Sequence, residues 1–420
     1  MRLQDFPRPA NDTGLGIHFG QDLRQISLGT YVPRMIELKM KWCLVPHQDE
    51  LQLQRAAQAI WAAGIMPISR WVCRIDQTIL DFVRLVNILT DLGIPPYIQI
   101  FNEPGDNREW NSGTPDFNRF VQRWVQHAGL VASAGGYPGL QVLDVDELRA
   151  VLRVLKSANA SAVLDRMWFC PHPYGANHPP DYPYDARNQQ DHPGATVFDD
   201  NTTVLGFLEF APAFQQEVGF IPPFIAGEGG WLYLNTEDAR YGAVDDKLHA
   251  QYHAALFNSF RTGKLPHNDA LPDYLFAFCP WIFYGGEKEA WYSWTTGTRQ
   301  PTIGAIKALP TFTRKFTWET ATPKPIAHYV LFGSPTVHAT LSQLIGARKY
   351  IAQFGPVVGF TASDATNAHT VTIIGDTRAV SASVDTQLQN AGYRVQRLDG
   401  DQYAVDAILA DRVARGAEFG

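Results

Sequence analysis

The stretch Tyr97–Pro104, with the sequence YIQIFNEP, decides the fold of this 420-residue chain. It opens with a mostly apolar run of the length of a buried strand, and Pro104 prevents the strand from continuing. Such a strand delivers the amide of Asn102 and the carboxyl group of Glu103 to a surface at its carboxyl end. The stretch therefore predicts a buried strand that ends in side chains able to do chemistry.

Segments typical of strands and helices alternate on both sides of this stretch. Strands are expected at 13–20, 35–43, 65–73, 97–103, 140–145, 166–170, 224–228 and 274–283, with segments of helical periodicity between them. Repeated strand-then-helix order requires parallel strands with right-handed crossovers. Eight such units predict an α/β fold with a closed (β/α)8 TIM barrel. An open doubly wound sheet is the alternative, but the glycines at 14–20 precede no convincing helix start.

The apolar periodicity lapses near 311–325, where the sequence becomes polar and contains prolines. Shorter strand and helix segments then alternate to the end of the chain. The sequence therefore predicts a barrel domain at 1–312, a linker at 313–326 and a small α/β accessory domain at 327–420. The sheet of this second domain is expected to be mainly parallel.

Composition describes a globular chain with ample material for a core, because 45% of its residues are hydrophobic and 18% are charged. The net charge of −7 gives no support for a nucleic-acid partner or an anionic membrane surface. No run approaches 18 apolar residues, so we expect no membrane span. The four cysteines, which lie far apart, are expected to be buried free thiols: Cys43, Cys73, Cys170 and Cys279.

Reacting groups in a (β/α)8 barrel lie at the carboxyl ends of the strands. The predicted ends of strands four, six, seven and eight carry Asn102, Glu103, His172, Tyr174, Glu228 and Trp281. Two facing carboxyl groups suit the cleavage of a glycosidic bond, since one can protonate the leaving oxygen while the other attacks or activates water. Asn102 is a candidate donor to a sugar hydroxyl, and His172 or Tyr174 could donate to Glu228.

Tryptophans near strand ends are candidate platforms for sugar rings, although most of them are expected to pack in the core. Trp281 stands out by its position at the barrel mouth, and Trp231 follows three residues after Glu228. The loop 172–192 is rich in His and Asp, but its spacing matches no zinc or calcium pattern. We therefore expect neither a metal nor another cofactor.

The pair formed by Asn102-Glu103-Pro104 and Glu228 resembles the clan A glycoside hydrolases. This resemblance covers roughly residues 13–310 and implies that Glu103 is the acid/base, that Glu228 is the nucleophile and that the reaction retains anomeric configuration. His172, Tyr174 and Trp281 match residues that usually surround such a site. We also expect Arg70, on the third strand, to bind the substrate. The implied substrate is a β-linked oligo- or polysaccharide.

The segment at 370–400 is similar to bacterial cell-wall-binding repeats of the type-2 class. That similarity implies contact with a cell-wall polymer and slightly favours a secreted or cell-surface location over a cytoplasmic one. A domain that only stabilises the barrel is the alternative. Two other functions stay open for the barrel itself: a non-catalytic carbohydrate-binding or cell-surface protein, and a transglycosylase that uses the same residues.

Overall fold

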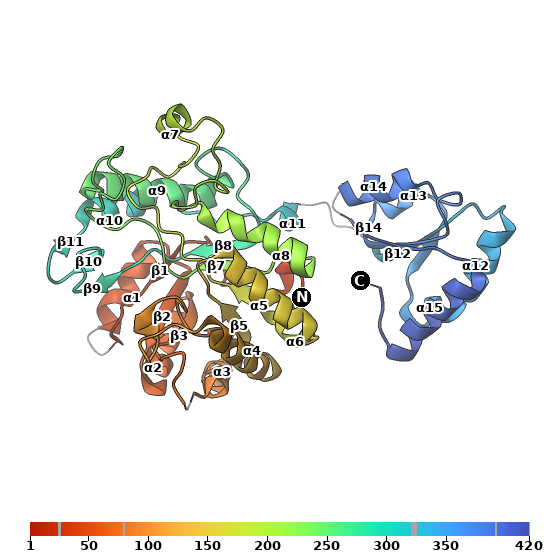
Figure 1. Ribbon diagram of the computed structural model, residues 1–420, viewed down its shortest axis with the longest axis horizontal. Coiled ribbons are helices and arrows are strands. Elements are labelled where there is room, and N and C mark those ends of the chain that lie inside the picture. Colours follow the sequence, from red (N-terminus) through yellow and green to blue (C-terminus); the bar gives the residue numbers. More distant parts are fainter. Residues whose placement is uncertain (24–26, 79, 321–325, 391–392, 420) are drawn as a thin grey trace. The chain divides into compact units, whose positions relative to one another are not determined.

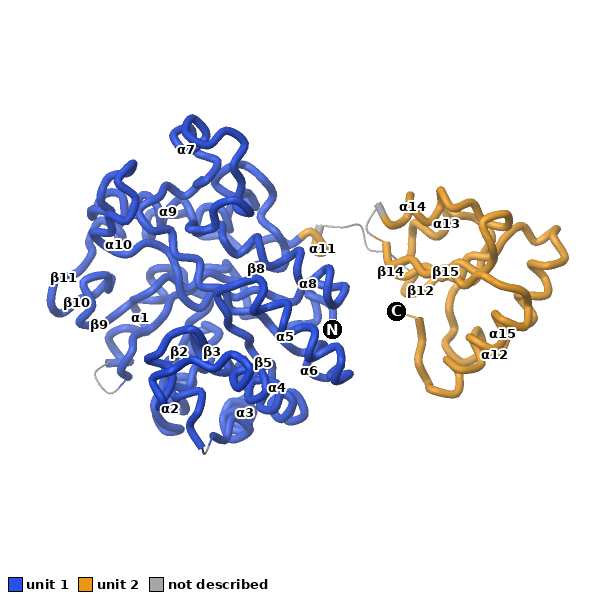
Figure 2. The backbone as a smooth tube through the Cα atoms, viewed as in Figure 1, with its two compact units in different colours: residues 1–316 blue, residues 317–420 orange. Residues whose placement is uncertain are grey.

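The computed structural model describes residues 1–23, 27–78, 80–320, 326–390 and 393–419. The chain divides into two compact units, Met1–Phe316 and Thr317–Gly420, which Figure 2 shows in different colours. Residues 321–325 of the predicted linker lie outside the described residues. Each unit is treated below by itself.

The first unit is built on an eight-stranded parallel sheet whose strands pair in the order of the sequence. Its strands are β1 Gly16–His18, β2 Trp42–His47, β3 Met66–Trp71, β4 Tyr97–Gln99, β5 Tyr137–Leu140, β6 Trp168–Phe169, β7 Phe224–Ala226 and β8 Leu275–Phe278. A parallel bridge between Leu15 and Phe278 joins the first strand region to the last. This pairing confirms the predicted (β/α)8 barrel.

The helices of this unit follow the strands, and most of them cover the outside of the barrel (Figure 1). They are α1 Leu28–Glu37, α2 Glu50–Ala62, α3 Phe82–Asp91, α4 Phe117–Ser133, α5 Val145–Ser157, α6 Ser161–Arg166, α7 Ala186–Asp191, α8 Phe210–Val218, α9 Asp246–Thr262 and α10 Gln300–Ala308. Many begin at an aspartate whose side chain accepts a backbone N–H of the first turn, as Asp49 does for α2 and Asp116 for α4. These caps satisfy donors that the helix itself leaves unpaired.

Two predicted boundaries are wrong. The segment 35–43 was expected to be a strand, but Met35 lies near the end of α1 and β2 begins only at Trp42. A short apolar run of this kind fits both the helical period of about 3.6 residues and the strand period of about 2. The helix that includes Met35 begins before this run, at Leu28. The fifth strand was expected at 140–145, but β5 already ends at Leu140, and Asp144 caps α5 by accepting two backbone N–H groups.

The barrel core is dense in aromatic side chains. Among the largest fully buried side chains are Trp42, Trp124, Trp168, Trp231 and Trp291. A strand that is covered on both faces has a nearly continuous apolar sequence. This explains why few of the barrel strands alternate between apolar and polar residues. The four cysteines are free and buried, as expected.

A short three-stranded sheet follows β8, formed by β9 Tyr284–Gly285, β10 Tyr292–Ser293 and β11 Gly297–Thr298. The described part of this unit also contains short 3-10 helices, among them η1 Leu3–Asp5, η3 Asn107–Glu109 and η4 Gly206–Glu209.

The second unit contains a four-stranded parallel sheet in the order β13-β12-β14-β15. Its elements are α11 Thr317–Thr320, β12 Ile326–Phe332, α12 His338–Phe354, β13 Val357–Gly359, α13 Ala362–Ala365, β14 Ala368–Ile374, α14 Ala382–Asn390, β15 Arg394–Leu398 and α15 Gln402–Arg415. Alternate residues of β12 enter two separate apolar clusters, Val330 and Phe332 in one and Tyr329 and Leu331 in the other. The sheet therefore has a packed layer on each face.

Among the residues that the structure describes, no helix has the length and apolar character needed to cross a membrane.

Candidate active site

A cleft of about 560 Å³ lies at the carboxyl ends of the barrel strands. Most of the strands contribute to it through their last residues or the loops that follow. Its lining includes His18, Gln21, Pro46, Arg70, Val72, Arg74, Asn102, Glu103, Arg108, Glu109, Tyr174, Glu228, Leu232 and Trp281. Most of the residues that line the cleft are thus polar or charged, and Pro46, Val72, Leu232 and Trp281 add apolar surface.

Glu103 and Glu228 meet in this cleft. One carboxylate oxygen of each residue and a ring nitrogen of His172 all lie within 4.8 Å of one another. Nδ1 of His172 is 2.9 Å from Oε1 of Glu103 and 3.9 Å from Oε2 of Glu228. The imidazole therefore contacts both carboxylates.

Both carboxylate oxygens of Glu228 accept hydrogen bonds. Arg70 donates to Oε1, and the hydroxyl of Tyr174 donates to Oε2 at 2.9 Å. The residue is only 7% exposed, and burial alone would raise the pKa of its carboxyl group. The positive charges of Arg70 and His172 outweigh burial and lower that pKa. Glu228 is therefore ionised at neutral pH.

His172 has the opposite balance. Burial would lower the pKa of its imidazole, but the negative charge of Glu228 and hydrogen bonds from its side chain, including the one to Glu103, raise that pKa to about 10. The imidazole is therefore protonated at neutral pH. Its positive charge lies beside both carboxyl groups.

The chain bends sharply where it presents Glu103. Phe101 and Glu103 both have positive φ, at 63° and 32°, which is uncommon for residues other than glycine. Asn102 between them is fixed by two hydrogen bonds: Oδ1 accepts from Gln99 at 3.1 Å, and Nδ2 donates to Glu109 at 3.2 Å. The backbone N–H of Glu103 donates to the side chain of Gln141, after β5.

The structure brings most of the predicted side chains to the cleft. Arg70, Asn102, Tyr174 and Trp281 line it together with the two glutamates. The side chain of His172 is buried behind the glutamates and bonds to Glu103.

Trp231 is the exception among the predicted residues, because it is fully buried and does not line the cleft. Its indole Nε1 donates to the carbonyl of His178 at 2.8 Å, and its ring packs against Tyr252 and His253. Gly229 and Gly230, just before it, have φ of 134° and 82°, a conformation in which an L side chain is strained. This turn separates Trp231 from Glu228.

Sequence reasoning missed several cleft residues, of which His18 and Glu109 are the most notable. His18 ends β1, and its Nε2 lies 3.6 Å from Oε1 of Glu228. Burial lowers the pKa of His18 to about 3, so the ring is neutral at ordinary pH. The strand-end rule applied to β1 would have found it, whereas Glu109 lies in η3 within a loop that carries no sequence signal.

Glu103, His172 and Glu228 could also offer three ligand atoms to a metal ion. Two observations oppose that interpretation. A histidine must be neutral to coordinate a metal, whereas the negative charge of Glu228 and the hydrogen bond to Glu103 favour the protonated form of His172. Glu228 is also already paired with the guanidinium of Arg70. The arrangement fits a pair of carboxyl groups in different surroundings better than a metal centre, since Glu228 is paired with Arg70 and Glu103 with His172.

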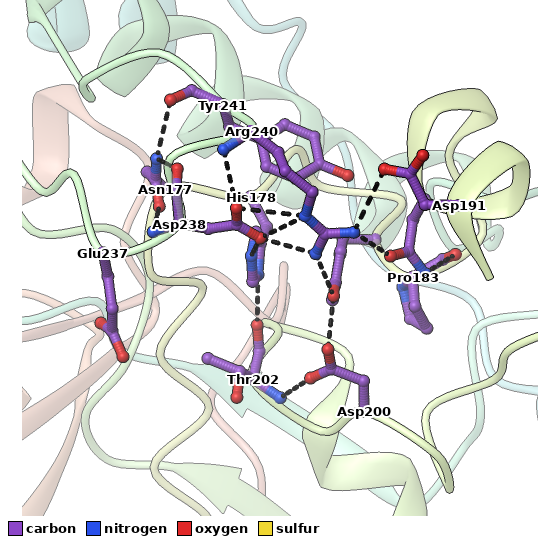
Figure 3. Close-up of polar contacts among 12 residues, drawn as sticks. Asn177, His178, Pro183, Asp191, Asp200, Thr202, Glu237, Asp238, Arg240 and Tyr241 are labelled. Atoms are coloured by element: carbon purple, nitrogen blue, oxygen red, sulfur yellow. Dashed lines mark hydrogen bonds and ion pairs between the residues drawn. The ribbon is translucent and has the colours of Figure 1, made fainter.

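A second polar network joins the long loop after β6 to the loop after β7 (Figure 3). Nδ1 of His178 is 2.7 Å from the carbonyl of Thr202, and its Nε2 is 3.0 Å from Oδ2 of Asp238. Arg240 donates to both oxygens of Asp238 and to the hydroxyl of Tyr182. These contacts fix the two loops that carry Tyr174 and follow Glu228.

Fold and site together define a (β/α)8-barrel protein with a cleft that holds a glutamate pair. Comparison with solved structures finds the catalytic domain of a mannanase from Streptomyces sp. SirexAA-E, with a TM-score of 0.36, 11% identity and coverage of 76% of this chain and 95% of that one. A Paenibacillus polymyxa xyloglucanase from glycoside hydrolase family 44 has a TM-score of 0.35, 10% identity and coverage of 61% of each chain.

A Bacteroides ovatus GH5 xyloglucanase, in complex with a XXXG heptasaccharide, has a TM-score of 0.37 and 13% identity, with coverage of 72% of this chain and 78% of that one. No protein-family model and no curated protein matches the chain. The barrel assignment rests on the strand pairing described above.

Proposed function

We propose that this protein is a retaining glycoside hydrolase that cleaves a β-linked glycan through a covalent glycosyl-enzyme intermediate. The observation that carries the proposal is the approach of Glu103 and Glu228, whose nearest carboxylate oxygens and the His172 nitrogen lie within 4.8 Å. Retaining enzymes hold their two carboxyl groups about 5–5.5 Å apart, whereas inverting enzymes need about 6.5–9.5 Å to admit water. The close approach of the two groups favours retention.

Glu228 is the nucleophile in this proposal. A carboxylate can attack only in its ionised form, and the charges of Arg70 and His172 keep Glu228 ionised despite burial. Both of its oxygens accept hydrogen bonds, which orient the carboxylate towards the cleft. Arg70 and Tyr174 are therefore positioning residues for the nucleophile.

Glu103 is the general acid and base. It lines the cleft, its side chain is more exposed than that of Glu228, and its closest charged neighbour is His172. In the first step Glu228 attacks the anomeric carbon while Glu103 gives its proton to the departing glycosidic oxygen. In the second step Glu103 takes a proton from water, and the water oxygen displaces Glu228 from the anomeric carbon.

The cleft walls suit a sugar ring, which has apolar C–H faces and a polar rim of hydroxyl groups. Trp281 provides an aromatic surface, and Asn102 and Glu109 provide a donor and an acceptor. The residues 327–420 are proposed as an accessory domain. Their contact with a cell-wall polymer stays a prediction.

The proposal is tested by incubating the whole protein with a panel of β-linked glucans, mannans, xylans and xyloglucan. Proton NMR at early times reads the anomeric configuration of the new reducing end. Turnover with a first-formed β-anomer supports the proposal. A first-formed α-anomer contradicts retention, and binding without turnover, unaffected by Glu103→Gln, supports a carbohydrate-binding protein instead.

A further inference from the structure

A chain of hydrogen-bonded side chains crosses the inside of the barrel and ends in the cleft. It starts at Cys170, directly after β6, whose thiol donates to Oε1 of Gln99 on β4 at 3.5 Å. Nε2 of Gln99 donates to the carbonyl of Phe101 at 3.2 Å and to Oδ1 of Asn102 at 3.1 Å. Nδ2 of Asn102 donates in turn to Oε1 of Glu109 at 3.2 Å. The amide of Asn102 is thus held from both sides.

The hydrogen bonds of this chain can run in only one direction. A backbone carbonyl can only accept, so the carbonyl of Phe101 requires the amide nitrogen of Gln99 on its side. That nitrogen also faces Asn102, which must therefore present its oxygen to Gln99 and its nitrogen to Glu109. Nδ2 of Asn102 carries two hydrogens, and Glu109 accepts one of them. Because Asn102 lines the cleft, the described residues leave the second hydrogen for a ligand there.

The inner end of the chain is fixed by close packing. Gln99 is fully buried, and the thiol of Cys170 lies against Gly227. A Cβ atom at Gly227 would come within 2.7 Å of Sγ of Cys170 and within 3.5 Å of Oε1 of Gln99, so only glycine fits without a shift of these groups. The residue after Gly227 is Glu228, and the inner end of the chain therefore packs beside the proposed nucleophile.

The outer end of the chain is fixed by the loop that contains η3. The backbone carbonyl of Glu109 accepts from the N–H of Ile75 at 2.9 Å, and the indole of Trp110 donates to the carbonyl of Pro104 at 2.8 Å. Nη1 of Arg74 lies 3.9 Å from Oε2 of Glu109, whose side chain is only 18% exposed. Glu109 is therefore held in place before a ligand binds, which lowers the cost of ordering the amide that it contacts.

We propose that Glu109 is a positioning residue that sets the substrate specificity of the cleft by directing the amide of Asn102 towards one hydroxyl group of the sugar, an inference that rests on the proposed function above. Asn102 touches the sugar, and Glu109 acts through it. A site that is built to bind a hydroxyl group discriminates against the analogue that lacks this group, because a buried polar group is then left unpaired. In this proposal the discrimination depends on Glu109.

The test compares Glu109→Leu, which removes the acceptor, with Glu109→Gln, whose amide oxygen can still accept from Asn102. Glu109→Ser is too short to reach Asn102 and repeats the first change without adding apolar surface to the cleft. Glu237→Leu is the matched control, because Glu237 is an exposed glutamate of the loop after β7 and does not line the cleft. All variants are assayed with an aryl β-glycoside of the sugar that the panel selects and with its monodeoxy derivatives, in which hydrogen replaces each hydroxyl group in turn.

Asn102→Ala identifies the hydroxyl group, because the effect of this substitution should vanish on the one derivative that lacks it. Glu109→Leu and Glu109→Ser should lower kcat/KM about tenfold for the parent glycoside and leave it nearly unchanged for that derivative. Glu109→Gln should lower kcat/KM for the parent by less than about threefold, since it keeps the acceptor. Glu237→Leu should behave as wild type on every substrate.

Three results would overturn the role of Glu109 while leaving the proposed function intact. They are an equal loss in Glu109→Leu on the parent and on the derivative, an equal loss in Glu109→Gln and Glu109→Leu on the parent, and an effect of Asn102→Ala that no derivative cancels. Failure of the wild type to cleave both the aryl glycosides and the glycans of the panel would overturn the proposed function, and this inference with it.

Discussion

The hydroxyl of Tyr174 donates a 2.9 Å hydrogen bond to Oε2 of Glu228, while Arg70 bonds to the other oxygen of the same carboxylate. The two donors come from different parts of the barrel, Arg70 from β3 and Tyr174 from the loop after β6. Together they stabilise a buried negative charge at the place where the proposed mechanism needs a nucleophile.

Replacing Tyr174 with Phe removes one of these donors without changing the shape of the ring. A hydrogen bond to a charged group contributes about 1.5–3 kcal/mol, so kcat should fall roughly ten- to hundredfold. The measurement is steady-state kinetics on the best substrate of the panel. Tyr403→Phe, at an 80% exposed tyrosine of the second unit, is the control and should behave as wild type. An unchanged kcat in Tyr174→Phe would show that the hydroxyl of Tyr174 does not assist the nucleophile.

Replacing Arg70 with Met should move the acid limb of the pH profile. Arg70 lowers the pKa of Glu228 against the raising effect of burial, so its loss raises that pKa and the ionised fraction falls at low pH. The acid limb of kcat/KM, measured from about pH 3 to about pH 9, should therefore shift to higher pH. Arg70→Lys keeps the charge and should shift the limb less. No shift in Arg70→Met would mean that another group sets the acid limb.

His172 should make the folded protein less stable at high pH. Its folded-state pKa is raised from 6.5 to about 10, so its contribution to stability is complete below about pH 6.5 and is lost as pH rises towards 10. Urea unfolding of the wild type should therefore show a falling free energy of unfolding across that window. His172→Gln should flatten this part of the curve. His192→Gln, at an exposed position of the same loop, should keep the wild-type slope.

Arg240 should stabilise the loops that flank the cleft. Arg240→Met removes the main partner of the Asp238 carboxylate, which is partly buried with a side chain 19% exposed and has a pKa lowered mainly by its hydrogen bond with Arg240. We expect a loss of about 2 kcal/mol in the free energy of unfolding. Tryptophan fluorescence reports this well, because every tryptophan except Trp318 belongs to the first unit.

Arg108→Met is the matched control for this loss. Arg108 also pairs with an aspartate two residues away, but its side chain is 81% exposed. Its removal should change the free energy of unfolding by less than about 0.5 kcal/mol. Equal losses in the two variants would show that the loop network contributes no more than a surface ion pair.

The strand ends were predictable because they follow from local pattern. Buried strands alternate with helices along the barrel, and the positions of Asn102, Glu103 and Glu228 after strand ends bring them to one cleft. The position of the second strand was not predictable, because residues 35–43 fit both the helical and the strand period. The helix that contains Met35 begins at Leu28.

The sequence also did not predict where individual side chains point in the loops after the strands. Trp231 follows Glu228 by three residues, but the turn at Gly229 and Gly230 directs its ring into the core. Glu109 reaches the cleft only because η3 folds back onto Asn102. Such contacts depend on loop conformations that no periodicity encodes.

The roles of the two glutamates are tested most directly by azide rescue. Glu228→Gly and Glu103→Ala are each assayed with an aryl β-glycoside that carries a good leaving group, with and without azide. In Glu228→Gly, azide replaces the missing nucleophile from the opposite face and should restore turnover with an α-glycosyl azide as product. In Glu103→Ala, azide attacks the glycosyl-enzyme and should give the β-glycosyl azide. The reverse pair of products, or rescue of Glu228→Gly by neither route, would contradict the assignment of Glu228 as the nucleophile.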